Sequence, residues 1–183
     1  MSAEVSLADR VVGLHLALES GGIPHAFGGA LALAWCTRRA RGTIDIDVNL
    51  FVGVDRLDDV LTSLPRAITT TDQQRAEIDH DGQTRIWWDA KTGEVFVSTT
   101  SFHEGAAERA RQESFNGHDV PFLDCSDLAV FKAFFDRTRD WADLEEMYAA
   151  GTLDVTSLVG TLTLLLGVDD RRVARLLALV DPR

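Results

Sequence analysis

The chain is 183 residues long, and 18 Lys and Arg against 29 Asp and Glu give it a formal net charge of −11. This length suits one compact domain, or a catalytic core with a small helical unit, and argues against two independent domains. The charge excludes a protein that binds nucleic acid through bulk positive charge, so any such contact must be local. A hydrophobic fraction of 45% with 26% charged residues is typical of a folded globular protein.

The sequence contains no signal for a membrane or for secretion. No run approaches the roughly 18 apolar residues of a membrane span, and the first residues lack a basic flank and a cleavage site. We therefore expect a cytoplasmic protein without membrane contact. Cys36 and Cys125 each lie in an apolar stretch, which favours two buried, reduced thiols over a disulfide or a catalytic cysteine.

The first elements form a strand, a tight turn and a helix behind an opening helix. Apolar residues at helical spacing predict an amphipathic helix over 7–20. The short apolar segment 25–27 then runs into Gly28 and Gly29, and the apolar residues 30–35 follow as a buried helix. The two glycines therefore mark a turn between a strand and a helix.

A second strand carries two acidic side chains. Residues 43–51 alternate between apolar and polar, so Asp45 and Asp47 are expected on the same side of a strand. A helix follows at 54–64, and the run 84–88 is rich in strand-forming residues.

The next segments predict further strands and then a change of character. A second strand at 94–99 is expected to pair with the run at 84–88 through a hairpin connection at 89–93. Residues 102–113 are rich in Ala and Arg and predict a helix, and 117–121 predicts a turn with a short edge strand. The rest is helical, with segments expected at 126–139, 142–149, 155–166 and 171–180.

The acidic pair and the glycine turn predict one chemistry together. Carboxylates at i and i+2 of a strand direct oxygen ligands into one small volume, which suits Mg²⁺ or Mn²⁺ bound jointly with a triphosphate. Asp45 and Asp47 alone would be more typical of a solvated strand face. Gly28 and Gly29 change this, because backbone N–H groups at a strand-to-helix turn can approach a phosphate closely. The combination predicts a site for a nucleoside triphosphate.

These segments resemble a known superfamily. Residues 26–34, with Gly28 and Gly29, and residues 41–49, with the two aspartates, match the pattern of the nucleotidyltransferases. More closely, they are similar to the AbiEii/AbiGii-type toxin nucleotidyltransferases, to which the MenT toxins belong. The resemblance implies an α+β fold, in which a polymerase-beta-like core holds a small mixed sheet flanked by helices. It places the catalytic core at 1–122 and a C-terminal helical bundle, packed on the core, at 123–183.

The same resemblance implies further site residues. Glu94 heads a strand on which the family carries a third metal-binding acid, usually Asp, and Phe102-His103 fits the pair that follows. Residues 131–144 resemble the C-terminal signature, which contributes Lys132, Asp140 and Asp143. This chain departs from that signature at Arg139, where Lys is commoner.

Several of these residues also have a purely structural interpretation. Glu94 fits a solvent-facing hairpin end, and Lys132 fits a cation on a helix surface, although its neighbours are apolar. Asp140 and Asp143 could complement nearby arginines along a helix. The arginines at 38, 39 and 41 fit either a solvated loop or a phosphate-binding segment.

The resemblance implies a phosphoryl transfer assisted by two metal ions. Asp45, Asp47 and Glu94 would hold Mg²⁺ or Mn²⁺. The triphosphate would be bound by a set of residues from both halves of the chain: Gly28, Gly29, Arg41 and Lys132, supported by Asp140 and Asp143.

The acceptor implied by the resemblance is the 3′ end of tRNA, and the biological role is that of a toxin neutralised by a cognate antitoxin. Two alternatives remain open at this stage. One is transfer to a small hydroxylated molecule, as in antibiotic-modifying relatives, and the other is a non-catalytic binding module with the same fold.

Overall fold

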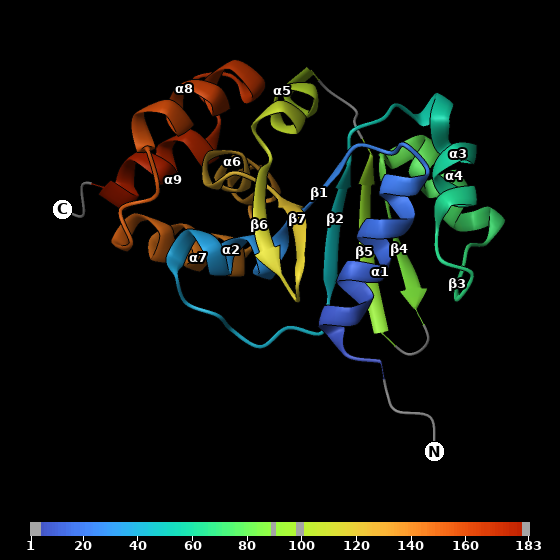
Figure 1. Cartoon of the computed structure of the whole chain (residues 1–183). Helices are drawn as coiled ribbons and strands as arrows, with labels where there is room; N and C mark the ends of the chain where they lie inside the picture. The colour runs from blue at the N-terminus through green and yellow to red at the C-terminus, as the bar shows by residue number, and fades with distance from the viewer. Residues whose placement is uncertain (1–4, 89–90, 98–100, 181–183) are drawn as a thin grey trace. The chain divides into compact units, whose positions relative to one another are not determined.

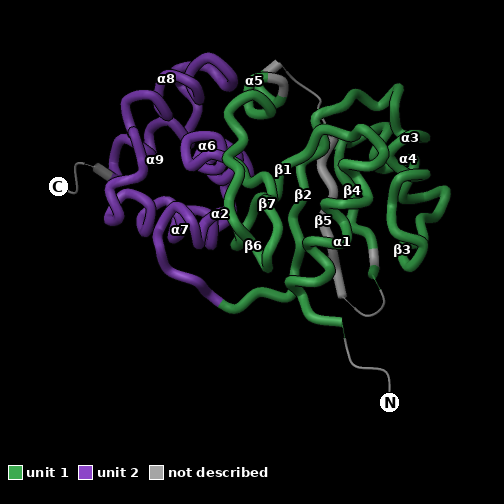
Figure 2. Tube along the Cα trace, viewed as in Figure 1, with its two compact units in different colours: residues 1–31, 42–123 green, residues 32–41, 124–183 purple. Residues whose placement is uncertain are grey.

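The structure is a computed structural model that describes residues 5–88, 91–97 and 101–180. Within these ranges, nothing is described for the side chains of residues 87, 91–97, 101, 104 and 180. The chain forms two compact units (Figure 2): unit 1 comprises residues 1–31 and 42–123, and unit 2 comprises residues 32–41 and 124–183. The predicted division into a core at 1–122 and a subdomain at 123–183 stays a prediction.

Unit 1 contains a mixed sheet of seven strands in the order β3-β4-β5-β2-β1-β7-β6 (Figure 1). The strands are β1 (His25–Phe27), β2 (Ile46–Leu50), β3 (Ile68–Thr69), β4 (Gln83–Trp88), β5 (Lys91–Val97), β6 (Arg111–Phe115) and β7 (His118–Phe122). The pairs β2–β5 and β1–β7 are parallel and the others antiparallel. The fold class is therefore α+β with a small mixed sheet flanked by helices, as predicted.

Unit 1 also contains helices, of which at least two cover the same face of the sheet. The helices are α1 (Leu7–Ser20), the 3₁₀ turn η1 (Val54–Arg56), α3 (Leu57–Ser63), α4 (Asp72–Asp81) and α5 (Ser101–Arg109), while α2 (Gly29–Thr37) begins in unit 1 and ends in unit 2. Thr84 and Trp88 share one face of β4 because alternate residues of a strand point the same way. Thr84 Oγ1 donates to Glu77 of α4 over 2.6 Å, and the Trp88 ring lies beside Gly13 of α1. Helices α1 and α4 thus pack on the same face.

The acidic side of β2 faces away from α1. His25 of β1 pairs in register with Leu50 of β2, and its ring contacts His15 of α1. Leu50 therefore lies on the face that α1 covers, and so does every second residue of β2 counted back from Leu50. Asp47 and Asn49 are among the residues in between, and they point to the opposite face.

Unit 2 is helical in the part that the structure describes. It contains the end of α2 together with α6 (Cys125–Phe135), α7 (Thr138–Ala149), α8 (Val155–Leu166) and α9 (Arg171–Val180). Asp124 and Asp154 cap the first turns of α6 and α8 through their side chains. The core consists of fully buried apolar side chains: Leu128, Ala133, Leu144, Met147, Leu162 and Leu176. The predicted C-terminal helical bundle is confirmed.

The start of β2 corrects one prediction. The strand was expected over 43–51, but it runs from Ile46 to Leu50, so Asp45 lies just before it. The Asp45 N–H donates to Thr43 Oγ1 over 3.2 Å. A short side-chain bond of this kind competes with strand pairing, which explains the later start.

Other corrections concern the segments around β5 and β6. The connection expected at 89–93 is shorter, because Trp88 pairs with Lys91. The helix expected over 102–113 ends at Arg109, and β6 follows as the partner of β7 across the Asn116-Gly117 turn, where φ is positive at both residues. The segment 117–121 is not an edge strand either, since β7 lies between β1 and β6.

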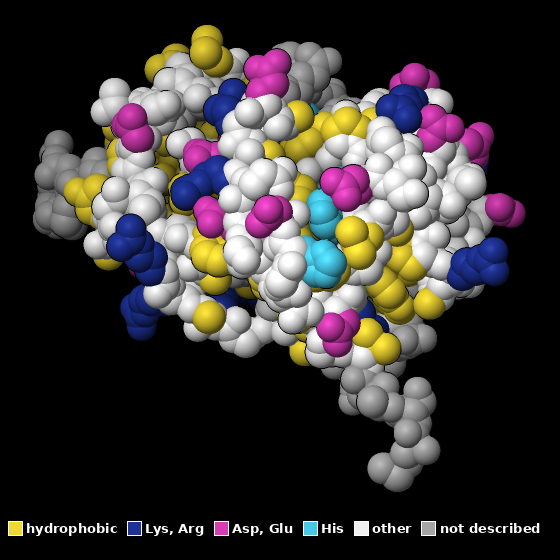
Figure 3. Space-filling view, viewed as in Figure 1, with side chains coloured by type: hydrophobic (Ala, Val, Ile, Leu, Met, Phe, Trp, Pro, Cys, Tyr) yellow, Lys and Arg dark blue, Asp and Glu magenta, His cyan; other side chains and the backbone are white. Residues whose placement is uncertain are grey.

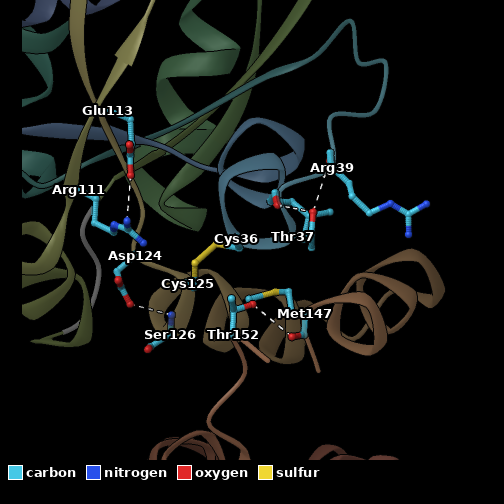
Figure 4. The surroundings of a disulfide bond; sticks show 11 residues. Cys36, Thr37, Arg39, Arg111, Glu113, Asp124, Cys125, Ser126, Met147 and Thr152 are labelled. Atoms are coloured by element: carbon cyan, nitrogen blue, oxygen red, sulfur yellow. Dashed lines mark hydrogen bonds and ion pairs between the residues drawn. A yellow bond between two sulfur atoms is a disulfide. The ribbon is translucent and has the colours of Figure 1, made fainter. Parts of the chain in front are cut away.

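A disulfide joins Cys36 and Cys125, which contradicts the prediction of reduced thiols. Figure 4 shows this bond between α2 and α6. The Cα atoms lie 5.6 Å apart, within the range that a disulfide spans, although the residues are 89 positions apart in the chain. Such proximity has no local sequence signal. None of the helices described has the length and apolar character to span a membrane.

Candidate functional site

The two glycines form the turn between β1 and α2. The Gly28 N–H donates to the Asp47 carbonyl over 2.9 Å, which extends the pairing of β1 with β2 by one residue. Gly29 then begins α2 with a φ of +54°, a left-handed conformation that favours glycine. The predicted order of strand, glycine turn and helix is confirmed.

Asp47 approaches this turn so closely that no side chain fits there. A Cβ placed on Gly29 would stand 1.5 Å from Asp47 Oδ2, and a Cβ on Gly28 would stand 2.9 Å from Asn49 Nδ2. A side chain at Gly29 would displace Asp47 and would strain the backbone, whereas at Gly28 the ends of the Asn49 and Leu123 side chains would have to shift. The half-buried carboxylate of Asp47 thus lies at the N-terminus of α2, where the unpaired N–H groups of a helix favour anions.

The other two predicted metal ligands lie beside Asp47 along the backbone. Asp45 precedes it by two residues and is half-buried. Glu94 of β5 is paired in register with Asp47, so the two backbones are adjacent in the sheet. The Glu94 side chain lies outside the described part of the chain, and its role as a third ligand stays a prediction.

The predicted residues of unit 2 form a buried cluster of charges. Lys132 of α6 is 6% exposed and donates to Asp143 Oδ2 over 2.5 Å, and its ammonium lies 3.6 Å from Asp140 Oδ1. Arg41 forms two hydrogen bonds to Asp143 with its guanidinium, as in a fork-to-fork pair. The sequence prediction named these four residues, and the structure brings all four together.

Asp143 is the centre of this cluster. Burial by itself would raise the pKa of Asp143, but the hydrogen bonds from Arg41 and Lys132 outweigh it and hold the pKa below its ordinary value. The carboxylate is only 1% exposed, so it remains charged because two cations surround it. Asp140 is also buried, and Arg137 Nε lies 3.1 Å from its Oδ2.

A second feature of unit 1 lies at the other end of β1 and was missed by the sequence interpretation. His15 Nδ1 and His25 Nε2 are 3.0 Å apart, and His25 Nδ1 bonds the Ile23 carbonyl over 2.8 Å. A cavity of about 410 Å³ beside them is also lined by Glu19 and Gln112. Histidine side chains gather beside α1 on the face shown in Figure 3. The apolar context of residues 23–27 hid this pair, because a lone His in such a run predicts packing.

Comparisons with known proteins support the fold. The antibiotic-resistance factor ANT(2'')-Ia has a solution structure similar to this chain, with a TM-score of 0.55 at 11% identity, covering 96% of this chain and 91% of that one. An antigenic nucleotidyltransferase-like protein from Paracoccidioides brasiliensis also gives 0.55, at 18% identity, with 96% and 89% covered. The chain has a nucleotidyltransferase fold. No protein-family model and no curated sequence matches it.

The glycine turn between β1 and α2 lies against the acidic strand β2. Unit 1 supplies this arrangement through Gly28, Gly29 and Asp47. Among the described side chains, no group of three or more His, Cys, Asp or Glu forms a ready metal site. The candidate site consists of the Asp47 carboxylate and the glycine turn, and Asp45 precedes Asp47 by two residues.

Proposed function

We propose that this chain is a metal-dependent nucleotidyltransferase, which moves a nucleoside monophosphate from a nucleoside triphosphate to an acceptor hydroxyl. The observation that carries the proposal is the contact between Asp47 and Gly29, because it places a carboxylate at a helix N-terminus that begins with a glycine turn. A carboxylate alone there would repel a phosphate. A cation bound to the carboxylate resolves this conflict and draws the triphosphate to the turn.

The residues fit Mg²⁺ or Mn²⁺. Asp45 and Asp47 offer carboxylate oxygens, which hard divalent ions prefer, and Mg²⁺ commonly uses one or two carboxylates together with substrate phosphates. Glu94 is the proposed third ligand. Bound there, the ion would supply charge stabilisation for the triphosphate and for the departing pyrophosphate.

The chain's own groups would bind and orient the nucleotide. The free N–H groups of the first turn of α2, from Gly29 onward, can donate to phosphate oxygens. Lys132 and Arg41 are the proposed cations for the triphosphate, although Asp143 now accepts hydrogen bonds from both. A phosphate would have to take over part of this bonding, so we assign Asp140 and Asp143 the role of holding the two cations in place.

For the acceptor, we propose the 3′ end of tRNA, which would make the protein a cytoplasmic toxin neutralised by a cognate antitoxin. The support is the resemblance of the segments 26–34 and 41–49 to the AbiEii/AbiGii-type toxins. A blocked tRNA end would stop aminoacylation and arrest growth.

A second candidate acceptor is a small hydroxylated molecule. The similarity of the fold to an antibiotic-resistance factor favours it. The charge of unit 1 also favours it, because 8 Lys and Arg stand against 18 Asp and Glu there, and an acidic surface attracts a cationic small molecule. A non-catalytic binding module with this fold is the third interpretation.

One experiment separates the three. The purified chain is incubated with Mg²⁺, each of the four α-labelled nucleoside triphosphates, and either total tRNA or a set of aminoglycosides. Labelled RNA supports the proposed function, and a labelled small molecule supports the second candidate. Absence of both products and of released pyrophosphate, with every nucleotide and with Mn²⁺ as well, would show that the chain does not transfer nucleotides.

A further inference from the structure

Three arginines of unit 2 lie in one short segment, residues 32–41, that has no acidic residue. The net charge of the chain is −11. A polyanion would be repelled by most of such a protein, so it would bind where uncompensated cations are exposed.

Most arginines of unit 2 are neutralised by a carboxylate. Asp143 pairs with Arg41, and other aspartates pair with four further arginines of unit 2: Arg137, Arg171, Arg172 and Arg175. Three arginines of unit 2 differ: Arg38, Arg39 and Arg139 are exposed, and none of their side chains makes a hydrogen bond or ion pair with any residue in the described ranges. Arg38 and Arg39 are adjacent in the chain. Their charge is available to a partner.

The backbone that carries these two arginines is fixed on several sides. Thr37 Oγ1 lies 2.9 Å from the Leu33 carbonyl and 3.4 Å from the Arg39 carbonyl. Cys36 is tied to α6 by the disulfide. Figure 4 shows the Arg39 guanidinium directed away from Thr37 and Cys36. Little ordering of the backbone is therefore needed when a ligand binds.

Arg38 itself has a φ of +54°, which is uncommon for a residue other than glycine. Arg38 directly follows the last residue of α2, and a left-handed residue at that position is a common way for a helix to end.

An exposed aromatic side chain precedes the two arginines. Trp35 lies three positions before Arg38 and four before Arg39, and 40% of its surface is exposed. Proteins that bind single-stranded nucleic acid combine cations for the phosphates with aromatic rings on which bases stack. Arg38, Arg39 and the exposed part of Trp35 offer both kinds of group within five positions of the chain.

We propose that Trp35, Arg38 and Arg39 bind a single-stranded segment of an RNA acceptor, with the arginines on its phosphates and the Trp ring against a base. The inference rests on the proposed function and chooses between its two acceptors. A polyanionic RNA is attracted to these groups, whereas an amine-bearing small acceptor is repelled by them.

The test measures binding of the full chain to a fluorescent 12-nucleotide single-stranded RNA by anisotropy, over a series of salt concentrations. Arg39→Gln and Arg38→Gln should each weaken binding at low salt by about three- to tenfold. Each should also reduce the slope of log K against log salt by about 0.7, the value for one phosphate contact on a single strand. Trp35→Leu should weaken binding by a similar factor and leave the slope unchanged, because stacking releases no counterions.

The matched control is Arg66→Gln, which removes one exposed arginine of unit 1 that likewise has no partner in the described ranges. It should keep the affinity and slope of the wild type, and melting curves should show that all four variants are folded. Competition with polyglutamate of equal length tests the alternative that the surface takes an acidic protein.

The outcomes separate the inference from the proposed function. If the wild type labels RNA while Arg38→Gln and Arg39→Gln bind it as the control does, the inference is overturned and the proposed function stands. If polyglutamate competes as well as RNA, the surface is a protein site and the inference is overturned. Pyrophosphate release without RNA binding or labelling would overturn the RNA acceptor together with this surface, while nucleotidyl transfer itself would stand.

Discussion

The Asp47 carboxylate lies against the backbone of Gly29, so closely that a Cβ on Gly29 would stand 1.5 Å from Asp47 Oδ2. This contact joins the acidic end of β2 to the start of α2. A side chain suited to metal binding thus contacts a turn suited to phosphate binding. A substitution at Gly29 is therefore expected to displace Asp47, and a substitution at Asp47 to alter the turn.

Replacement of Gly29 by alanine should therefore abolish nucleotide turnover. The added Cβ would displace Asp47, and φ of +54° disfavours any residue but glycine. Gly22→Ala is the matched control, because Gly22 has a φ of +62° but no atom within 4 Å of an added Cβ. The control should lose about 1 kcal/mol of stability through backbone strain and keep its activity. Equal activity of the two variants would contradict the tight contact.

Removal of the disulfide should destabilise the chain. The bond closes a loop across 89 positions, for which loop-closure entropy gives an upper value of about 4 to 5 kcal/mol. Thermal melting with and without a phosphine reductant measures the effect, and the expected result is a clear fall in Tm on reduction. The double variant Cys36→Ser/Cys125→Ser should melt at the lower temperature under both conditions. A wild-type Tm that does not respond to full reduction would be inconsistent with a bond in solution.

The buried histidine pair should make the fold sensitive to acid. Burial lowers the pKa of both His15 and His25 below 6.5, with Glu19 opposing this shift for each and His118 adding to it for His15. The unfolded chain then binds more protons than the folded chain below about pH 6.5, so stability falls as the pH drops through this range. Urea unfolding between pH 5 and 8 measures the trend.

The double variant His15→Gln/His25→Gln should lose the part of this acid sensitivity that comes from the pair, whereas His103, whose pKa is also lowered by burial, should keep its own part. His80→Gln serves as the control, because His80 is exposed and its pKa is raised by the hydrogen bond with Asp81, which is the opposite sign. An unchanged pH dependence in the double variant would assign the acid sensitivity to other groups.

Lys132 should contribute to both stability and nucleotide affinity. Lys132→Met leaves the buried Asp143 with Arg41 as its remaining cation, so we expect a loss of about 2 to 4 kcal/mol in urea unfolding. The affinity for a nucleoside triphosphate, measured by calorimetry well below Tm, should fall as well. Arg139→Met is the control, since Arg139 is exposed on the same helix as Asp143. Normal affinity in a destabilised Lys132→Met would show that Lys132 has only a structural role.

The sequence predicts the elements that have a clear apolar period. The helices at Leu7–Ser20, Val155–Leu166 and Arg171–Val180 were predicted to the residue, because each carries an apolar stripe bounded by a cap or a glycine. Helix α4 was missed, since only Ile78 of its residues is buried and all the others except Ala76 are polar. Its signals were the capping box formed by Thr71 and Gln74 and the glycine that follows its last residue.

For residues far apart in sequence, only a motif offered a link. The sequence interpretation assigned Lys132, Asp143 and Arg41 to one triphosphate site, which stays a prediction, and the structure joins the three through hydrogen bonds. The contact between His15 and His25 has no motif, and neither does the disulfide. Such pairs depend on how the elements pack, which a local pattern does not contain.

The central claim is that Asp47 binds the metal ion used for nucleotidyl transfer. Asp47→Asn keeps the size of the side chain, and so the fit against Gly29, but removes its charge. The most direct measurement is release of pyrophosphate from a nucleoside triphosphate, with Mg²⁺ and tRNA, by the wild type, Asp47→Asn and the exposed control Asp119→Asn. The account predicts that the control matches the wild type and that Asp47→Asn is at least about a hundredfold slower. Wild-type turnover in a folded Asp47→Asn would contradict it.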